Sequence, residues 1–247
     1  MASKEKRLRI FAGPNGSGKS SLFHDFSNKA DFKVGYFLNA DNVEKELREK
    51  GFINLSELNL EVDKKSFQDF NKSSSLKRKA KKEGYKIDIK FKDNILVNLP
   101  KETNSYEAAF VTAFIRQEFI KTGISYSFET VMSHPSKLDE MVSAKNAGYK
   151  TYLYYICTES PIINKDRIDN RVEMGGHNVD EDKIRSRYFA SLNLLYNAIK
   201  LVRRAYIFDN SGREYKLIAE FFEGEVKYHN KTFPKWFLRD VIEKMDV

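Results

Sequence analysis

The stretch Ile10-Phe11-Ala12-Gly13-Pro14-Asn15-Gly16-Ser17-Gly18-Lys19-Ser20-Ser21-Leu22 decides the fold class. Residues 13–20 satisfy the pattern G-x-x-x-x-G-K-[ST] in full, after an apolar run and before a helix-compatible one. In this pattern a strand ends in a glycine-rich turn whose backbone N–H groups surround phosphate oxygens, and the N-terminus of the next helix faces the same anion. Lys19 would add a cation for the β- and γ-phosphates, and the Ser20 hydroxyl would bind Mg²⁺. The residues predicted to bind ATP are Gly13, Pro14, Asn15, Gly16, Ser17, Gly18, Lys19, Ser20 and Ser21.

The composition sets limits on the class of protein. The chain has 247 residues, 41% of them hydrophobic, and a formal net charge of +8. A packed core is therefore expected, and the basic excess favours anionic partners such as nucleotides, nucleic acid or an acidic protein. The single Cys157 excludes an intrachain disulfide and a cysteine-rich zinc site. Residues 1–9 are charged and precede only a short apolar run, so we expect neither a secretory signal nor a membrane span, and a cytoplasmic location.

Short β-branched and aromatic runs alternate with longer helix-compatible stretches, which is typical of an α/β fold with a parallel sheet. Such a sheet binds its ligands outside the carboxyl ends of the strands. Asp41 and Glu129 end two of the runs, so we expect both near the phosphate loop. The five expected core strands are 8–12, 35–40, 124–130, 149–157 and 205–209.

A long segment, 53–104, separates the second and third of these strands. Within it, residues 55–70 are predicted to form a helix, and 85–91 alternate as a half-buried strand that 95–99 could pair with as a hairpin. Residues 77–82 form a concentrated basic run. Two interpretations of this run stay open: a solvated helix face, or a contact surface for an anionic substrate or partner.

Arginines gather in the segment after the fourth strand. Arg167 and Arg171 are spaced to share one face of a helix, and Gly175-Gly176-His177 separates that helix from a second one carrying Arg187. A helical hairpin at this place, about 160–190, is typical of a lid that closes over a transferring phosphoryl group. Its arginines would neutralise the charge that develops on the γ-phosphate, or would form surface ion pairs with neighbouring acids.

Two acidic residues are candidates for the chemistry. Asp41 could take the proton from an acceptor hydroxyl, or could cap the helix that begins near Asn42. Glu129 closes the third strand, where it would organise metal or water, or would pair with Lys19. Thr130 and His134 flank it as weaker candidates.

Together these motifs resemble the zeta toxin family of P-loop kinases over residues 7–52 and 104–240. The motifs that carry the resemblance are the phosphate loop, Phe37-Leu38-Asn39-Ala40-Asp41, Phe128-Glu129-Thr130-Val131, Arg167-x-x-x-Arg171-x-x-x-Gly175-Gly176-His177, Ile184-x-x-Arg187-Tyr188 and Tyr206-Ile207-Phe208-Asp209-Asn210-Ser211. The resemblance implies phosphorylation of a hydroxyl that depends on ATP and Mg²⁺, in the known toxins on the sugar of UDP-N-acetylglucosamine. It also implies neutralisation by a small antitoxin. The segment 53–104 is longer and more basic than is usual for the family, so the acceptor stays open.

The resemblance also implies roles for single residues. Lys19 would bind the ATP phosphates, Asp41 would be the general base, Glu129 would help to hold the substrate, and the lid would supply its arginines. The predicted catalytic residues are Asp41, Lys19, Arg171 and Arg187. The predicted substrate-binding residues are Asn39, Asp41, Glu129, Thr130, His134 and Arg167, and the metal candidates are Ser20 and Glu129.

The sequence therefore predicts one P-loop kinase domain over 1–247, with an α+β insertion at 53–104, the lid, and a C-terminal hairpin and helix at 213–247. The expected acceptor is a small, anionic metabolite such as a nucleotide sugar, and whether the chain is a toxin or a resident metabolic kinase stays open. The alternative is a nucleic-acid-associated P-loop NTPase that uses the basic insertion. Steep loss of binding with salt would mark that alternative.

Overall fold

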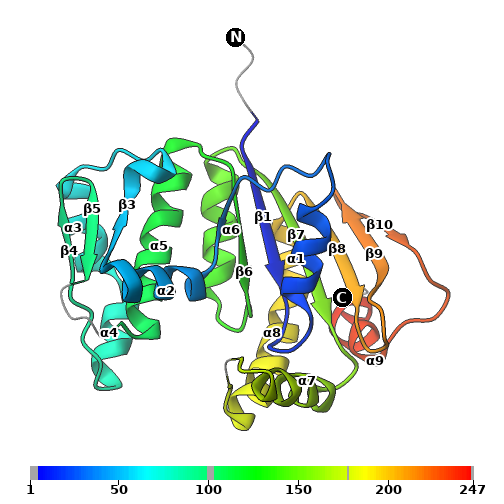
Figure 1. Cartoon of the computed structure of the whole chain (residues 1–247). Helices are drawn as coiled ribbons and strands as arrows, with labels where there is room; N and C mark the ends of the chain where they lie inside the picture. The colour runs from blue at the N-terminus through cyan, green and yellow to red at the C-terminus, as the bar shows by residue number, and fades with distance from the viewer. Residues whose placement is uncertain (1–4, 99–102, 177, 246–247) are drawn as a thin grey trace. The chain divides into compact units, whose positions relative to one another are not determined.

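The computed structural model of the chain describes residues 5–98, 103–176 and 178–245, and it divides into two compact units (Figure 1). The first unit comprises Met1–Gly35 and Ser127–Val247, and the second comprises Tyr36–Tyr126. The second unit is wider than the predicted insertion, because it includes the second predicted strand and the helices on both sides of 53–104. The assignment of the whole chain to one kinase domain stays a prediction.

The first unit is built on a sheet with the strand order β10-β9-β8-β7-β1-β6. The strands are β1 (Arg7–Ala12), β6 (Tyr126–Thr130), β7 (Lys150–Cys157), β8 (Arg204–Asp209), β9 (Lys216–Phe222) and β10 (Glu225–Tyr228). β1, β7 and β8 are parallel, whereas β9 and β10 run antiparallel beside them. The predicted α/β fold with a parallel sheet is confirmed. The predicted C-terminal hairpin is also present, and the sequence did not indicate that it extends this sheet.

Helices cover both faces of the sheet. They are α1 (Lys19–Ser27), α6 (Ser136–Asn146), α7 (Pro161–Glu173) and α8 (Glu181–Leu201), followed by the short turns α9 (Lys235–Phe237), η2 (Leu238–Ile242) and α10 (Glu243–Met245). The Tyr154 ring contacts Phe26 of α1 with centroids 5.3 Å apart, and the next residue, Tyr155, meets Ser191 of α8 through their hydroxyls at 3.0 Å. Successive residues of a strand point to opposite faces, so α1 and α8 lie on opposite sides of the sheet, as Figure 1 shows.

The lid predicted at about 160–190 corresponds to α7 and the start of α8. The two helices are separated at Gly175-Gly176, as expected; His177 lies outside the described residues.

Aromatic side chains hold the centre of the first unit together. Phe11, Tyr154 and Tyr206 stack across three adjacent strands, with ring centroids 4.8 and 5.0 Å apart. Trp236 is buried and donates its indole N–H to the Asp209 carboxylate at 3.0 Å, so the C-terminal turns are anchored to the end of β8. Trp236 is thus a packing anchor.

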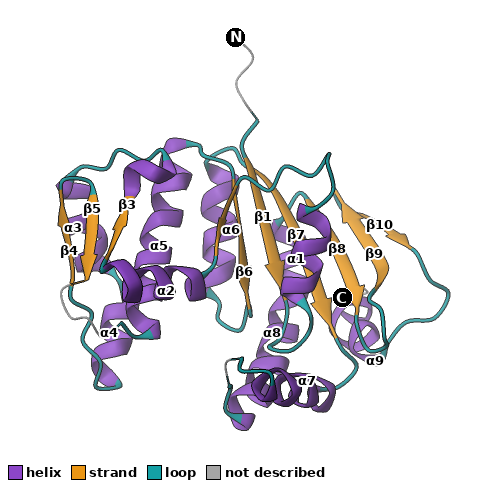
Figure 2. Ribbon diagram, in the orientation of Figure 1, coloured by secondary structure: helices purple, strands orange, loops and turns teal. Residues whose placement is uncertain are grey.

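The second unit combines helices with a small antiparallel sheet of order β3-β5-β4 (Figure 2). Its elements are β2 (Tyr36–Leu38), α2 (Ala40–Lys50), β3 (Phe52–Asn54), η1 (Leu55–Leu58), α3 (Lys64–Ser73), α4 (Ser75–Lys82), β4 (Ile89–Lys92), β5 (Ile95–Asn98) and α5 (Ser105–Thr122). The predicted hairpin is present as β4 and β5, although its last predicted residue, Leu99, lies outside the described residues.

Two local predictions in this unit are wrong in extent. Residues 55–70 do not form one helix: Asn59 takes a left-handed conformation (φ 54°) that ends the first turn, and the Asp63 side chain caps a new helix. The strand predicted from Tyr85 begins only at Ile89. Gly84 has a φ of 82°, and the half-exposed Tyr85 ring packs 5.4 Å from that of Tyr106 instead of entering the sheet.

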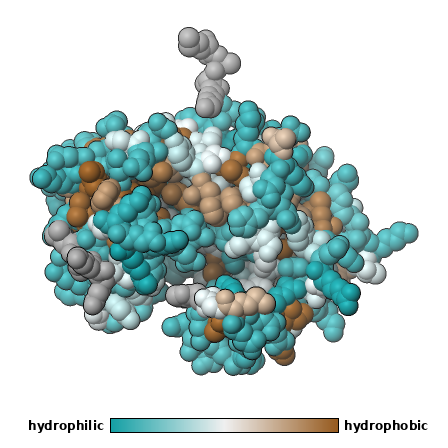
Figure 3. All heavy atoms as spheres, viewed as in Figure 1, coloured by the Kyte–Doolittle hydropathy of each residue, from teal (hydrophilic) through white to brown (hydrophobic). Residues whose placement is uncertain are grey.

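Most of the surface visible in Figure 3 is hydrophilic, in keeping with 32% charged residues. Among the described residues, no helix is long and apolar enough to cross a membrane.

Candidate nucleotide site

The phosphate loop lies between β1 and α1. At two of its positions, close backbone neighbours leave room only for glycine. Gly13 and Gly16 have φ values of 148° and 74°, which side chains rarely adopt. A Cβ at Gly13 would collide with the backbone carbonyl of Ile156 at the end of β7. A Cβ at Gly16 would lie 3.1 Å from both the carbonyl carbon and the Cα of Asn164 on α7, with the carbonyl oxygen closer still. The loop can therefore keep this shape only with glycine at both positions.

The ends of neighbouring strands hold the loop in place. The Gly13 N–H donates to the Thr130 carbonyl at the end of β6, at 3.2 Å. The Asn210 side-chain amide, just after β8, donates to the Ser17 carbonyl at 2.8 Å. A Cβ on Gly18 would collide with that amide. Strand ends more than a hundred residues away thus shape the loop.

The loop presents groups suited to an anion. Gly18 caps α1 in a left-handed conformation, and the first turn of the helix contains no acidic residue. Lys19 is its first residue, and its ammonium donates to the Pro14 carbonyl at 2.8 Å, across the loop. The Ser17 hydroxyl is buried without a hydrogen-bond partner among the described residues. A buried polar group without a partner is costly, so a phosphate oxygen fits this cradle.

Ser20 and Glu129 form the part of the site suited to a metal. The Ser20 hydroxyl donates to a Glu129 carboxylate oxygen at 3.0 Å, although 109 positions separate the two residues. No cluster of three or more His, Cys, Asp or Glu side chains that could hold a metal occurs in the described part of the chain. Mg²⁺ bound with a nucleotide usually takes only one or two protein groups and completes its shell with phosphate and water. The Ser20–Glu129 pair fits that donor set.

The two weaker candidates after β6 shape the chain locally. The Thr130 hydroxyl accepts the Met132 N–H at 3.0 Å, and Met132 has a left-handed φ of 54°. His134 Nδ1 accepts the Ser136 N–H at 3.2 Å, at the start of α6. These bonds build the turn that follows Glu129, and a role in substrate binding stays a prediction for both residues.

The arginines of the predicted lid lie on α7 and α8, and their role stays a prediction. Arg167 donates to the Gly212 carbonyl in the loop after β8, at 3.1 Å, and so connects α7 with the strand end that carries Asn210. Arg171 is exposed near the end of α7, and its carbonyl accepts the Gly176 N–H at 2.9 Å. Arg187 is half-buried on α8.

Asn39 and Asp41 lie in the second unit, whereas the other predicted site residues lie in the first. The Asn39 side-chain oxygen accepts the Asp41 N–H at 2.8 Å and caps α2. The alternative in which Asp41 is the cap is therefore wrong, because the helix begins at Ala40, two residues earlier than expected. Asp41 sits in the first turn of α2 with an exposed side chain, so its carboxylate does not serve as the helix cap.

Sequence reasoning missed Asn164 and Asn210 as parts of the site. Asn164 is fully buried on α7; its side-chain oxygen accepts the Thr158 hydroxyl, and its NH₂ group has no hydrogen-bond partner among the described residues. An asparagine on the buried face of a helix that directly follows a strand end is a signal that could have indicated it. Asn210 belongs to a motif already noted, directly after Asp209.

Cys157, at the end of β7, takes no part in this chemistry. Burial raises the pKa of its thiol well above the ordinary value, so the sulfur stays protonated and unreactive.

Comparisons with known proteins agree with this architecture. The chain is similar to one in the crystal structure of the AvrRxo1-ORF1:AvrRxo1-ORF2 complex with sulphate ions, with a TM-score of 0.56, 14% identity, and coverage of 93% of this chain and 62% of that one. The crystal structure of the complex with ATP gives a TM-score of 0.53, 13% identity, and coverage of 92% and 62%. The chain therefore shares its fold with the matched chain of that complex.

Sequence comparison covers less of the chain. No family model matches it. An uncharacterized protein of Haemophilus influenzae is 38% identical over 69 residues, which are 28% of this chain and 49% of that protein. The chain thus spans about half of that relative and less than two thirds of the structural neighbours.

Proposed function

We propose that this protein is an ATP-dependent kinase that transfers the γ-phosphate to a hydroxyl of a small metabolite. The observation that carries the proposal is the hydrogen bond between Ser20 and Glu129. This pair lies beside a loop in which the neighbouring backbone leaves room only for glycine at two positions. A hydroxyl and a carboxylate at the start of the loop helix are the protein groups that a magnesium–nucleotide complex needs. The ATP complex of a protein with a similar fold supports ATP as the donor.

Several residues of the chain would each have a separate role in the proposed phosphoryl transfer. Lys19 exchanges the Pro14 carbonyl for the β- and γ-phosphates, and bound Mg²⁺ would neutralise charge on the same oxygens. Arg171 and Arg187 supply positive charge from the lid and help to exclude water. Asp41 accepts the proton of the attacking hydroxyl. Phosphoryl transfer of this kind depends on positioning and charge neutralisation more than on covalent catalysis.

The acceptor and the biological role are further parts of the proposal. The resemblance to the zeta toxins favours a nucleotide sugar such as UDP-N-acetylglucosamine, and the net charge of +8 suits an anionic acceptor. The fold neighbour was crystallised with a second protein, AvrRxo1-ORF2, which supports a small protein partner, such as an antitoxin, for this chain. Expression with and without a neighbouring small gene product would separate a toxin from a metabolic kinase.

The kinase proposal is tested with γ-labelled ATP and a panel of nucleotide sugars, nucleotides and cell extract. We expect label on an organic acceptor, and loss of at least about 100-fold in transfer for Asp41→Asn, because general-base catalysis contributes that much. The matched control is Asp69→Asn, an exposed aspartate in the same unit. Equal transfer by wild type and Asp41→Asn would exclude Asp41 as the base. Transfer to water alone would favour an ATPase.

The exposed face of α4 favours one second candidate, a nucleic-acid-associated NTPase. Arg78, Lys81 and Lys82 are exposed on this helix and form no ion pair with any described residue. Binding of single-stranded nucleic acid that falls steeply with salt and stimulates ATP hydrolysis would support this candidate over the kinase.

A further inference from the structure

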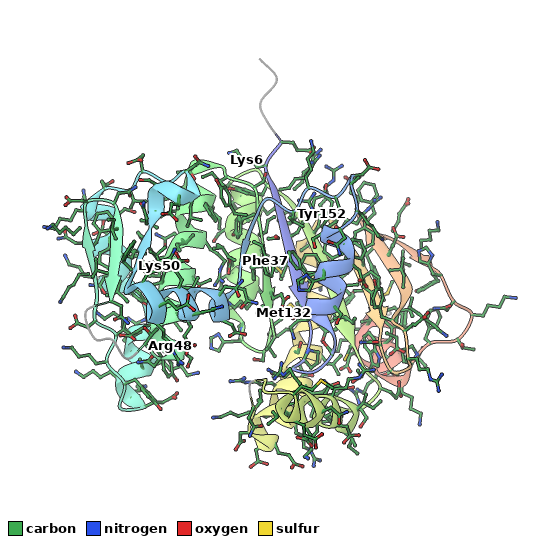
Figure 4. All side chains as sticks on the ribbon, in the orientation of Figure 1. Lys6, Phe37, Arg48, Lys50, Met132 and Tyr152 are labelled. Atoms are coloured by element: carbon green, nitrogen blue, oxygen red, sulfur yellow. The ribbon has the colours of Figure 1, made fainter. Side chains whose placement is uncertain are left out.

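A pocket of the first unit lies at the carboxyl ends of β7 and β8, beside the C-terminal turns. Its volume is about 720 Å³ including its open mouth, which is within the range of small-molecule sites. Figure 4 labels Tyr152 near the start of β7, and the pocket lies beyond the other end of this strand, past Cys157. Its lining residues are Glu159, Asp209, Ser211, Lys216, Ile218, Asn230, Thr232, Phe233 and Pro234.

The pocket lies on the side of the sheet away from α1. The Asp209 carboxylate in its lining accepts the Trp236 indole N–H, and the Trp236 ring lies with its centroid 6.2 Å from that of Tyr155. Tyr155 points toward α8, whereas the phosphate loop leads into α1 on the opposite side of the sheet. The pocket is therefore separate from the proposed nucleotide site.

Two carboxylates line the pocket without a cation beside them. Both Glu159 oxygens accept the backbone N–H of Lys235, at 3.2 Å each. Asp209 accepts the Trp236 indole N–H at 3.0 Å and the Ser211 hydroxyl at 2.8 Å on one oxygen, and the Ser211 N–H at 3.3 Å on the other. Neither carboxylate forms an ion pair with a residue that the structure describes, and both keep capacity to accept further bonds. These acceptors suit an ammonium group.

Lys216 brings the opposite charge to the same pocket. It is the cross-strand neighbour of Asp209 in the β8–β9 pair. Lys216 is exposed and forms no ion pair within the described part of the chain. A ligand that carries an ammonium and a carboxylate on one carbon would satisfy both charges of the lining. A simple amine would instead leave Lys216 without a partner and would be repelled by it.

The remaining wall suits an apolar side chain. Ile218 is buried, and the Phe233 ring packs against those of Tyr228 and Phe237 with centroids 5.1 and 5.4 Å apart. The ring is therefore held in place at the edge of the pocket, and Pro234 continues the same wall. Apolar walls with a few well-placed charged groups are typical of small-molecule sites.

The lining is connected to the phosphate loop through residues 209–212. Asp209 and Ser211 line the pocket, and Asn210 between them donates to the Ser17 carbonyl at 2.8 Å. The Gly212 carbonyl accepts the Arg167 guanidinium of α7 at 3.1 Å. A ligand bound to Asp209 would therefore act on the segment that holds both the loop and α7.

We propose that this pocket is an effector site for a free α-amino acid with an apolar side chain. The ammonium group binds Glu159 and Asp209, the carboxylate binds Lys216, and the side chain packs on Ile218 and Phe233. Its binding changes the affinity of the phosphate loop for nucleotide, and nucleotide changes the affinity for the amino acid by the same factor. The coupling rests on the proposed nucleotide binding, whereas the amino-acid site does not.

The first test uses the full chain and measures binding of each standard amino acid by titration calorimetry. We expect leucine or phenylalanine to bind at least about ten-fold more tightly than the amine that lacks its carboxylate or the acid that lacks its ammonium, because each analogue loses a charge-assisted contact. Glu159→Gln and Lys216→Met should each weaken binding about ten-fold for the same reason. Glu214→Gln and Lys231→Met, both exposed and outside the lining, are the matched controls.

Three results would overturn the amino-acid site. They are that no amino acid binds, that the amine alone binds as tightly, or that Glu159→Gln and Lys216→Met both bind as well as wild type does. Glu159→Gln keeps a side-chain oxygen for the Lys235 N–H, so its loss of binding would not arise from loss of that anchor.

The second test measures the affinity for a non-hydrolysable ATP analogue with Mg²⁺, with and without saturating amino acid. We expect a change of about five-fold or more, and a smaller change for Glu159→Gln at the same amino-acid concentration. Equal affinities would overturn the effector role. Failure of the proposed nucleotide function gives a different pattern, in which the analogue does not bind at all and the amino acid still does. Lys19→Ala should reproduce that pattern.

Discussion

The contact between Gly16 and α7 makes the sharpest prediction. Gly16 has a φ of 74°, and a Cβ there would lie 3.1 Å from two backbone atoms of Asn164, where ordinary contacts are 3.4–4 Å. Those atoms belong to the helix that carries Arg167 and Arg171. The Asn164 carbonyl oxygen would lie closer still, so Gly16→Ala must separate the loop from α7 by a distance approaching 1 Å.

Gly148→Ala is the matched control for the conformational part of the effect. Gly148 has a similar φ of 80°, but a Cβ there would meet nothing within 4 Å. Both variants should lose about 1 kcal/mol of unfolding free energy from the left-handed conformation alone. Gly16→Ala should lose roughly a further 1–3 kcal/mol, the usual cost of overpacking.

The functional effect should separate the two variants further. A misplacement approaching 1 Å in a phosphoryl-transfer site costs about 100-fold in rate, so Gly16→Ala should lose about that factor while Gly148→Ala keeps wild-type turnover. The assays are transfer of label from γ-labelled ATP and urea unfolding followed by circular dichroism, which also shows that each variant is folded. The reasoning is refuted if Gly16→Ala matches Gly148→Ala in both stability and turnover.

Two further predictions concern stability. The raised pKa of Cys157 means that the native thiol stays protonated while the unfolded thiol ionises near pH 8.5, so stability is kept below that pH and lost above it. Between pH 7.5 and 9.5 the wild type should lose about 1.4 kcal/mol more in urea unfolding than Cys157→Ala; an equal loss would contradict this origin. Asn39→Ala should cost about 1 kcal/mol by removing the cap of α2, whereas Asn42→Ala, one turn inside the helix, should not destabilise it.

Much of the fold could be predicted from local sequence. The phosphate loop between β1 and α1, the two helices separated at Gly175-Gly176 and the β4–β5 hairpin each follow from residues within a few positions of one another. Reasoning from local sequence failed where two neighbouring residues are equally suited to cap a helix and only one of them does so. Asn39 and Asp41 are both good helix caps, and only the backbone conformation of Asn39, extended at φ −122°, decides which one caps α2.

The sequence by itself predicted the phosphate loop between β1 and α1, because a glycine-rich turn between a strand and a helix N-terminus is defined by neighbouring residues. Only the tertiary structure decided what completes the site. Ser20 meets Glu129 across 109 residues, and Asn210 reaches Ser17 across 193. Such pairings depend on which strand ends and helices become neighbours, and no local pattern encodes that choice.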